Sequence, residues 1–458
     1  MMEKRYLKWY NKVGYGSGDV AGNVVYAFLS TFMMFYLTET IGMNIGVVGT
    51  LMALSKLFDG ITDIFFGTLI DKTHSKMGKA RPWMMYGYIG CAVALAAIFM
   101  VPTSWGEKAQ YAYFFVTYTL LNAVFFTANN IAYASLTALI TKNSSERVQL
   151  GSIRFIFAFA TSLLIQYVTI DVVNAFGGGA YGWKMVAIVY AIIGLVVNTI
   201  SCLSVKELSA EELDETDDKD LQEEEEKYTL VQAAKLLFSN KYYLMICATY
   251  IGTQLYASAL NMGLYFMKFI LGNEDYLGDF SLAINIPLII GLLITPTLVR
   301  KMGGMYKINV IGYVVAVIGR ALVIVAGYMG SVPLMLVFTA VAAFGTSPLQ
   351  GDLNALIASC SEYTFHTKGK RIDGTMYSCS SFGIKVGGSL GTAACGWLLD
   401  SAGFIEQAAV QTASAINMLH ILYLWLPMFL NIFVTIVLSR LKVEKANKAL
   451  LASNDSIS

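Results

Sequence analysis

Three charged residues stand close together inside one long apolar stretch of the chain, and their spacing gives them a common face. The stretch runs from Ser55 to Asp71 and contains Lys56, Asp59 and Asp63. On a helix, residues three and four apart lie on the same side, so the three charges share one stripe. A charge inside a membrane span costs several kcal/mol unless it is paired or lines a polar cavity. We therefore predict a cation site at the two carboxylates; the alternative is a structural ion pair with Lys56.

The composition is that of a membrane protein. Of 458 residues, 56% are hydrophobic and only 14% are charged, whereas a soluble chain carries about a quarter charged residues. The net charge is +1, because the charges lie in loops and cancel there, and we expect no nucleic-acid partner. The six cysteines are scattered without CxxC spacing, which indicates small core residues and neither a disulfide framework nor a metal site.

Apolar runs separated by polar breaks predict an all-α polytopic membrane protein with twelve transmembrane helices. The expected spans are 18–40, 46–70, 83–102, 110–140, 151–174, 184–204, 242–271, 279–299, 308–328, 332–358, 374–399 and 416–440. Lysine and arginine gather in alternate loops and at both ends of the chain. Because basic loops stay in the cytoplasm, both termini are expected there, in a multi-pass protein of the plasma (inner) membrane.

The chain divides near its middle at an acidic stretch that contains Glu223 to Glu226. Such a stretch cannot bury apolar surface, and we expect a solvated cytoplasmic connector. The predicted parts are a six-helix half at 1–204, the connector at 205–240, a second six-helix half at 241–440 and a tail at 441–458. Lys76-Met-Gly78 and Lys301-Met-Gly303 hold the same place in each half. Two related halves indicate a transporter whose repeats rock about a central site.

Other polar residues within the spans are candidates for the same site. Thr62 adds a hydroxyl beside the carboxylate pair, and Thr127 with Asn130 offers oxygens in the fourth span. Arg154 and Lys385 are cations in the fifth and eleventh spans. For each residue the alternative is ordinary helix–helix bonding, or a lysine or arginine reaching to the membrane surface. The tyrosines at 15, 26 and 133 are candidates to line a cavity.

Several motifs, taken in order, resemble those of one family. They are Tyr15-Gly-Ser-Gly-Asp-Val-Ala-Gly-Asn23, Lys56-Leu-Phe-Asp-Gly-Ile-Thr-Asp63, Lys76-Met-Gly-Lys-Ala-Arg-Pro-Trp83, Phe126-Thr-Ala-Asn-Asn-Ile-Ala-Tyr133 and Ser381-Phe-Gly-Ile-Lys385. The chain resembles the glycoside–pentoside–hexuronide:cation symporters, the melibiose permease group of the major facilitator superfamily. The resemblance runs from about residue 12 to residue 440. It implies the major facilitator fold and cation-coupled sugar transport.

The resemblance also implies roles for particular residues. The coupling cation, Na⁺ or H⁺, is assigned to Asp59, Asp63, Thr62 and Thr127. The solute is assigned to Asp19, Asn23, Tyr26, Asn130, Tyr133, Arg154 and Lys385. Structural or gating roles fall to Lys56, Asp71 and Arg81. No further cofactor is expected, and the partners are a small sugar or glycoside, a monovalent cation and the lipid bilayer.

The sequence departs from the family pattern at the sugar site. Asn130 and Val24 stand where the melibiose permease has sugar-binding aspartates, which makes melibiose itself an unsuitable solute. A site with Arg154 and Lys385 but fewer carboxylates would tolerate an anionic sugar such as a hexuronide. Two alternatives stay open: a non-sugar solute, such as a lipid or a conjugate, and a membrane-embedded Mg²⁺-dependent enzyme that uses Asp59 and Asp63.

Overall fold

The computed structural model describes residues 5–208, 237–369 and 373–455. The side chains at 61, 64, 71, 144, 145, 148, 354, 373–375, 377–382 and 453–455 lie outside the described part. Most of the predicted connector at 205–240 also lies outside the described residues, as does the side chain of Asp71. Over the part that is described, the chain is helical and forms no strand.

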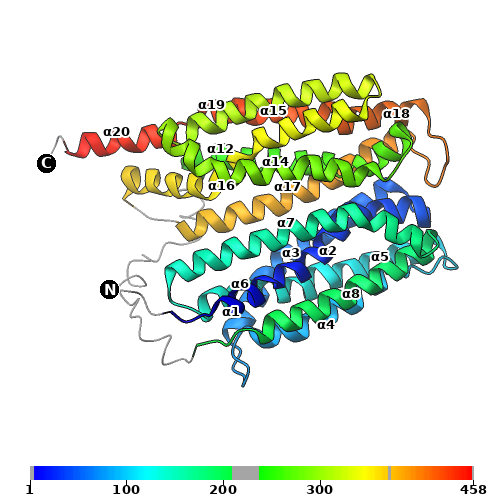
Figure 1. Ribbon diagram of the computed structural model, residues 1–458, viewed down its shortest axis with the longest axis horizontal. Helices are drawn as coiled ribbons and strands as arrows, with labels where there is room; N and C mark the ends of the chain where they lie inside the picture. Colours follow the sequence, from blue (N-terminus) through cyan, green and yellow to red (C-terminus); the bar gives the residue numbers. More distant parts are fainter. Residues whose placement is uncertain (1–4, 209–236, 370–372, 456–458) are drawn as a thin grey trace. The chain divides into compact units, whose positions relative to one another are not determined.

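The chain packs as two compact units, and unit 1 combines Met1–Asp217 with Gly396–Ala415. Its long helices run side by side in Figure 1. They are α1 (Trp9–Gly16), α2 (Gly18–Phe35), η1 (Tyr36–Ile41), α3 (Ile45–Asp71), α4 (Arg81–Ile98), α5 (Glu107–Thr119), η2 (Leu120–Phe126), α6 (Thr127–Leu139), α7 (Ser144–Ala175) and α8 (Gly179–Leu203), where η marks a π-helical turn.

Unit 2 combines Asp218–Cys395 with Ile416–Ser458. Its elements are α12 (Lys241–Leu260), α13 (Gly263–Phe266), η3 (Met267–Leu271), α14 (Tyr276–Met302), α15 (Met305–Tyr328), α16 (Val332–Lys368), α17 (Asp373–Ser401), α18 (Ala413–His420), η4 (Ile421–Trp425), α19 (Leu426–Arg440) and α20 (Val443–Asp455). The last turns of α17 and the start of α18 belong to unit 1.

These helices are long and apolar because a bilayer leaves no other partner for their backbone groups. Within the described residues, nine helical segments are long and apolar enough to cross a membrane. The predicted spans at 83–102, 242–271 and 374–399 also form helices, but glycine, tyrosine and hydroxyl residues lower their mean hydropathy. Many large apolar side chains point outward, as hydrocarbon surroundings allow.

Each unit holds one helix N-terminus with a glutamate from much later in its sequence. In unit 1 the Glu207 carboxylate accepts the backbone N–H groups of Lys79, Ala80 and Arg81 at 2.6 to 2.9 Å. In unit 2 the Glu444 carboxylate accepts those at residues 305 and 306, at 3.1 and 3.0 Å. A carboxylate there satisfies donors that have no partner within the helix and complements its dipole. The same kind of contact thus occurs in both units, and the two related six-helix halves stay a prediction.

The segment Gly396–Ala415 holds the beginning of α3 within unit 1. Asn44 Nδ2 donates to Asp400 Oδ1 at 2.6 Å, and Ile45 N donates to Glu406 Oε1 at 2.9 Å. Two acidic side chains thereby sit at the positive end of the helix dipole. The fit is close, because a Cβ added at Gly46 would lie 2.8 Å from Asp400 Oδ2. The helix that carries the predicted cation ligands therefore starts from a fixed position.

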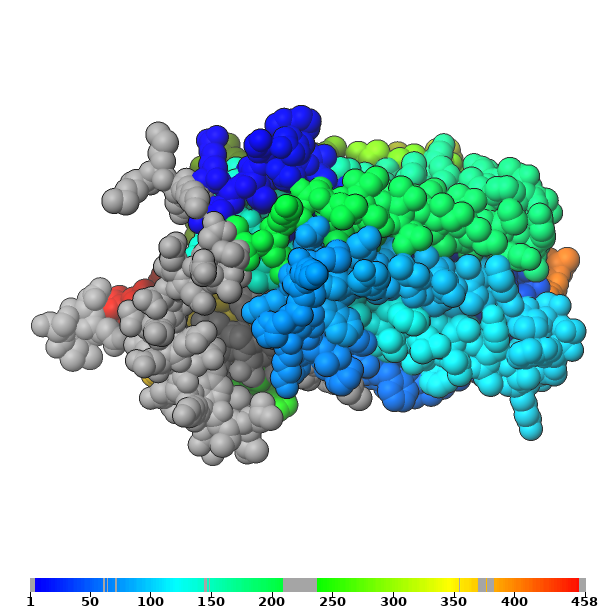
Figure 2. Space-filling model, turned by 90° about the horizontal axis from the view of Figure 1, so that it is seen from below, coloured from blue at the N-terminus to red at the C-terminus, as the bar shows by residue number. Residues whose placement is uncertain are grey.

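The N-terminal segment is tied to the start of α7 and to the end of α8. Figure 2 shows this dark-blue segment beside the green end of α8, where Asn11 Nδ2 donates to Ser204 O at 2.6 Å. The buried Glu146 carboxylate accepts the backbone N–H groups of Tyr6 and Leu7, each at 3.2 Å, and its Oε1 lies 3.1 Å from the ammonium of the lysine at position 12.

Hydrogen bonding keeps this glutamate charged. Burial raises the pKa of Glu146, but the hydrogen bonds from Thr141, Lys12 and the N-terminal backbone outweigh it and leave the pKa below its ordinary value. A carboxyl group whose pKa is lower in the folded than in the unfolded protein adds stability above the unfolded pKa. That contribution is lost as the pH falls through the folded pKa.

We expect Glu146→Gln to lower the free energy of unfolding by about 1–3 kcal/mol at neutral pH, because several donors lose a charged acceptor. The difference from the wild type should shrink as the pH falls below about 4.5, the ordinary pKa of glutamate. Thermal unfolding in detergent between pH 4 and pH 7 measures the loss of stability and its dependence on pH. Glu107→Gln, on the exposed first turn of α5, is the control. A pH-independent difference would contradict this interpretation.

Candidate functional site

A carboxylate on α3 and a hydroxyl on α6 meet inside unit 1. The Thr127 hydroxyl donates to Asp59 Oδ1, and it also lies 2.7 Å from the carbonyl oxygen of Asn122. Thr127 directly follows the π-helical turn η2, and such turns are frequent at functional sites. It thereby reaches the carbonyl five residues earlier. The local irregularity of the fourth span is what brings this hydroxyl to the carboxylate.

The remaining predicted cation ligands follow along α3. Asp63 is one turn after Asp59, and both are half-buried. The Thr62 hydroxyl lies 3.1 Å from the carbonyl oxygen of Asp59 and 3.3 Å from that of Phe58. Its hydrogen is therefore used within the helix, while the lone pairs of its oxygen stay available to a cation. Lys56, also half-buried, precedes Asp59 by one turn.

A second polar cluster joins three of the predicted solute residues. Arg154 Nε on α7 lies 2.6 Å from Asp19 Oδ2 on α2. The Tyr133 hydroxyl on α6 donates to the same carboxylate oxygen at 2.9 Å. The guanidinium also stands 4.2 Å from the centre of the Tyr133 ring. Asn23 lies one turn further along α2, and its Nδ2 donates to the Asp19 carbonyl oxygen at 2.9 Å.

Aromatic rings support this cluster from one side. The rings of Tyr15 and Tyr133 lie 4.8 Å apart, centre to centre. Each hydroxyl is bonded to the other's backbone: Tyr15 donates to the Tyr133 carbonyl oxygen at 2.6 Å, and Tyr133 lies 2.9 Å from that of Tyr15. Gly18 makes this approach possible, because a Cβ there would come within 2.7 Å of the Tyr133 ring. The two tyrosines hold α1, α2 and α6 in fixed positions around Asp19.

Two neighbouring asparagines of the fourth span have different surroundings. Asn129 is buried, and its Nδ2 donates to the Met84 carbonyl oxygen at 2.6 Å and to Asn198 Oδ1 at 3.0 Å. That is helix–helix bonding. Asn130 is exposed on the surface of unit 1, as is Tyr26, whose side chain is 60% exposed. Their roles at the solute stay predictions.

Three further predicted residues are described by the elements that carry them. Lys385 is half-buried on α17 in unit 2. Arg81 holds the start of α4, since its Nε donates to the Cys202 carbonyl oxygen at 3.0 Å. Asp71 ends α3, and its side chain is outside the described part. The gating roles assigned to Arg81, Asp71 and Lys56 stay predictions.

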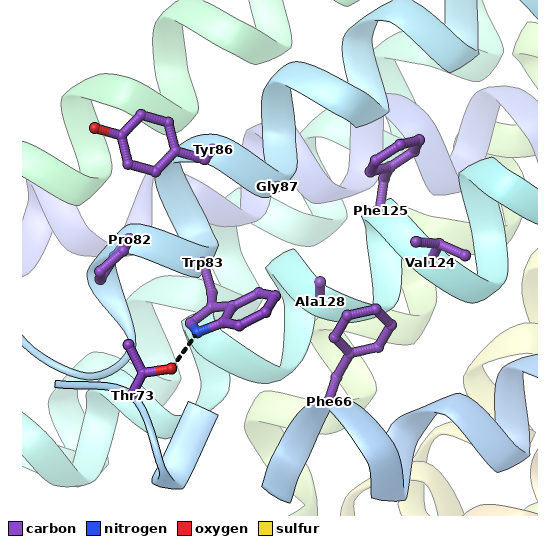
Figure 3. A pocket seen from close by; sticks show the side chains of 9 residues that line it. All are labelled: Phe66, Thr73, Pro82, Trp83, Tyr86, Gly87, Val124, Phe125 and Ala128. Carbon is purple, nitrogen blue, oxygen red and sulfur yellow. Dashed lines mark hydrogen bonds between the residues drawn. The ribbon is translucent and has the colours of Figure 1, made fainter. Parts of the chain in front are cut away.

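Unit 1 also has an open pocket of about 430 Å³, which does not coincide with either cluster. Figure 3 shows its lining of aromatic and aliphatic side chains from α3, α4, η2 and α6. Two of the lining residues carry hydroxyls, Thr73 and Tyr86, and Thr73 Oγ1 already accepts from Trp83 Nε1 at 2.7 Å. A sugar site needs several polar groups aimed at the ligand. The lining of this pocket is mainly apolar, so the pocket is poorly suited to a sugar.

The donor set at Asp59 and Asp63 fits a monovalent cation. Among the described residues, no group of three or more histidine, cysteine, aspartate or glutamate side chains comes together as for a metal ion. Two carboxylates with hydroxyls nearby supply hard oxygen ligands and can also hold a proton.

The sequence analysis did not identify several charged groups that are buried or half-buried in the structure. Glu146, Glu207 and Glu444 lie next to polar loops, where charged residues are usual. The one signal for two of them is the repeated position of a glutamate after the last span of each half. Asp352 on α16, which is 9% exposed, accepts from Asn309 Nδ2 at 3.3 Å and was also missed. Arg320 lies within the predicted span 308–328 and was given no role.

Comparisons with known proteins agree with this architecture. A family model described as MFS/sugar transport protein matches residues 14–445. An isoprimeverose transporter from Lactiplantibacillus pentosus is 28% identical over 99% of this chain and 92% of its own. A glucuronide carrier protein homolog from Escherichia coli (strain K12) is 26% identical over 90% of this chain and 87% of its own. The crystal structure of a D-xylose–proton symporter has a TM-score of 0.66 at 13% identity, covering 93% of this chain and 96% of its own.

The family model and the long apolar helices define a multi-pass membrane transporter of the major facilitator type, and the solved structure agrees in fold. Within that class, the chain belongs to the MFS/sugar transport protein family. The predicted fold class and the resemblance to glycoside–pentoside–hexuronide:cation symporters are thereby confirmed. Because this family consists of transporters, the alternative of a membrane-embedded enzyme is not supported.

We expect the Asp19–Arg154 pair to show a coupling free energy of about 1–3 kcal/mol in a double-mutant cycle of Asp19→Asn and Arg154→Gln. Either single change leaves one charge without its partner in a half-buried place, so each should destabilise more than the double change. Thermal unfolding of the four proteins measures this. The control is the Lys268–Glu274 pair, at 3.8 Å and more exposed, for which at most about 1 kcal/mol is expected. Equal coupling in both cycles would contradict the prediction.

Proposed function

We propose that this protein carries a small sugar or glycoside across the plasma membrane together with Na⁺ or H⁺, by alternating access of its two units. The observation that carries the proposal is that one helix joins the two polar clusters. On α6, Thr127 contacts Asp59 and Tyr133 contacts Asp19. The two residues are about 9 Å apart along the helix axis. A change at the cation ligands therefore reaches the solute cluster through a single rigid element.

The cation acts by neutralising the carboxylates on α3. Without it, Asp59 and Asp63 bring negative charge into the membrane-spanning part of unit 1, which is costly. A cation removes that cost and so lowers the energy of the states through which the units rearrange. One charge moving down 100 mV supplies about 2.3 kcal/mol, enough to concentrate a solute about fifty-fold.

The two candidate cations place the hydrogen of Thr127 differently. This hydroxyl has one hydrogen but lies near two acceptors, Asp59 Oδ1 and the Asn122 carbonyl oxygen. A proton on Asp59 lets the carboxyl donate to Thr127 and Thr127 donate to Asn122, so that every group is satisfied. Na⁺ would instead take oxygen atoms from the carboxylates and hydroxyls. The geometry admits both ions.

The solute cluster is suited to hydroxyl groups. The paired Asp19 and Arg154 offer acceptor and donor atoms side by side, as vicinal hydroxyls of a sugar require. The rings of Tyr15 and Tyr133 offer an apolar face. Since Asp19 already neutralises Arg154, this cluster by itself favours an uncharged sugar. The relatives' names include both isoprimeverose and glucuronide, so a hexuronide would need a further positive partner.

We expect Asp63→Asn to abolish cation-driven accumulation while the protein still folds, because an amide cannot carry the charge that the cation neutralises. Thr127→Val, which removes only a hydroxyl, should weaken the apparent cation affinity by about tenfold or more, a loss of about 1.4 kcal/mol. Thr199→Val on α8 is the matched control, since its hydroxyl bonds only its own helix. Uptake of labelled sugar into proteoliposomes measures these effects. Uphill, cation-dependent uptake by Asp63→Asn would contradict the assignment.

The ion and the solute are identified by counterflow in proteoliposomes, with Na⁺ and pH varied separately. Under the proposal, one of the two variables alone changes the exchange of a labelled glycoside. Ligand-induced thermal stabilisation over a panel of glycosides, uronides and lipids separates a sugar carrier from one for another solute. Stabilisation by lipids alone would favour the non-sugar alternative.

A further inference from the structure

Arg320 is a buried cation in the middle of a membrane-spanning helix. Its side chain is 1% exposed, which makes it one of the largest fully buried side chains among the described residues. It lies on α15, eight residues before the helix ends at Tyr328 and therefore about 12 Å inside. A guanidinium keeps its charge at any accessible pH, so the charge itself is buried there.

This guanidinium has only a neutral partner within the described residues. Its Nη2 and Nε donate to the Tyr256 hydroxyl of α12, at 2.6 and 3.2 Å. Its Nη1 is buried without a hydrogen-bond partner. None of the ion pairs found over the described part of the chain includes it. Arg154 in unit 1 differs, because Asp19 neutralises it.

The surroundings leave the charge uncompensated. The buried Tyr423 of η4 is close enough for its hydroxyl to interact electrostatically with Arg320. Tyr256 is half-buried, so it links the guanidinium to the surface of unit 2. Its oxygen takes two N–H groups from the guanidinium, and the hydroxyl hydrogen points elsewhere. An unpaired cation in such a place attracts an anion far more strongly than a cation in water does.

We propose that Arg320, with Tyr256, forms a binding position for an anionic group in unit 2. The ligand is a carboxylate or sulfonate of the solute, or a small inorganic anion such as chloride. The free Nη1–H and the Tyr256 O–H are its donors, and a carboxylate can accept both. The solute form of this proposal rests on the proposed transport function. The guanidinium of Arg320 would pair with the carboxylate of a hexuronide. Arg154 is less suited to that role, because Asp19 already neutralises it.

The test compares Arg320→Met with the wild type, using phenyl glucuronide, the matched phenyl glucoside and sodium chloride as probes in thermal unfolding. We expect an anionic probe to stabilise the wild type and its apparent affinity to fall at least tenfold in Arg320→Met. The effect of the glucoside should stay within twofold. Unfolding without a probe should occur at the same or a higher temperature, because replacing an unpaired buried charge by an apolar side chain is often neutral or stabilising.

Arg320→Lys keeps the charge and is the second variant, in case the methionine variant does not fold. It should retain stabilisation by the anion. Arg300→Met, in the exposed last turn of α14, controls for the general loss of a positive charge. Glucuronide-specific stabilisation identifies the solute as the source of the anion, and chloride-specific stabilisation identifies an inorganic ion.

Two results would overturn the proposal: no stabilisation of the wild type by either anionic probe, or equal stabilisation of the wild type and Arg320→Met. Both are distinct from failure of the proposed function, because the measurement does not require transport. Stabilisation by anions in a protein that transports no sugar would leave the anion site standing and remove the transport assignment.

Discussion

The cost of placing a charge in hydrocarbon constrains this protein more than any other interaction. Helix formation pairs the hydrogen-bonding groups of the backbone, and outward apolar side chains are compatible with lipid. Both features are common to all spans, so neither distinguishes one span from another. The charged side chains do. Within the spans, Asp59 is bonded by Thr127, and Asp19 is bonded by Arg154 and Tyr133. Each of these contacts links two helices, so the same bonds that engage the charged side chains fix how the helices of unit 1 are arranged.

The fourth span has a special place in that arrangement because it serves both clusters. It contains a π-helical turn, and Thr127 lies directly after it. The turn precedes both Thr127 and Tyr133, so it sets the rotation of α6 as a whole relative to α5, since one residue of phase corresponds to about 100° of rotation. The relation between the two clusters follows from the spacing of Thr127 and Tyr133 on the one continuous helix α6. Cation coupling, as proposed, needs such a relation, because the affinity for one ligand must depend on the other.

The sequence predicted those features that depend on local order along the chain. The helical fold follows from apolar runs of sufficient length, and the shared face of Asp59 and Asp63 follows from a spacing of four residues. Pairings between residues far apart in the chain could not be predicted in this way. Asp19 and Arg154 are 135 residues apart, and nothing in either motif states that they form an ion pair. That pairing changes the chemistry, because an arginine expected to attract an anionic sugar has its charge compensated.

The difference between Asn129 and Asn130 was also beyond the sequence. Both are polar residues in the same span, yet one bonds Met84 and Asn198 in the core and the other is exposed. Adjacent helical positions differ by about 100° in direction, but which direction meets a neighbouring helix depends on tertiary packing. The glutamates 207 and 444 were missed for a different reason, since loop residues gain a structural role only when the fold returns them to a helix start.

The two units differ in how their charges are compensated. In unit 1 the half-buried Arg154 faces a carboxylate, whereas in unit 2 the buried Arg320 faces a phenol. A phenol accepts hydrogen bonds but does not cancel the charge, so the electrostatic cost stays with the folded protein. Selection for stability alone would favour a methionine or leucine at such a position, since either fills the space without a charge. A retained cation is therefore explained most simply by a ligand that supplies the missing negative charge during part of the transport cycle.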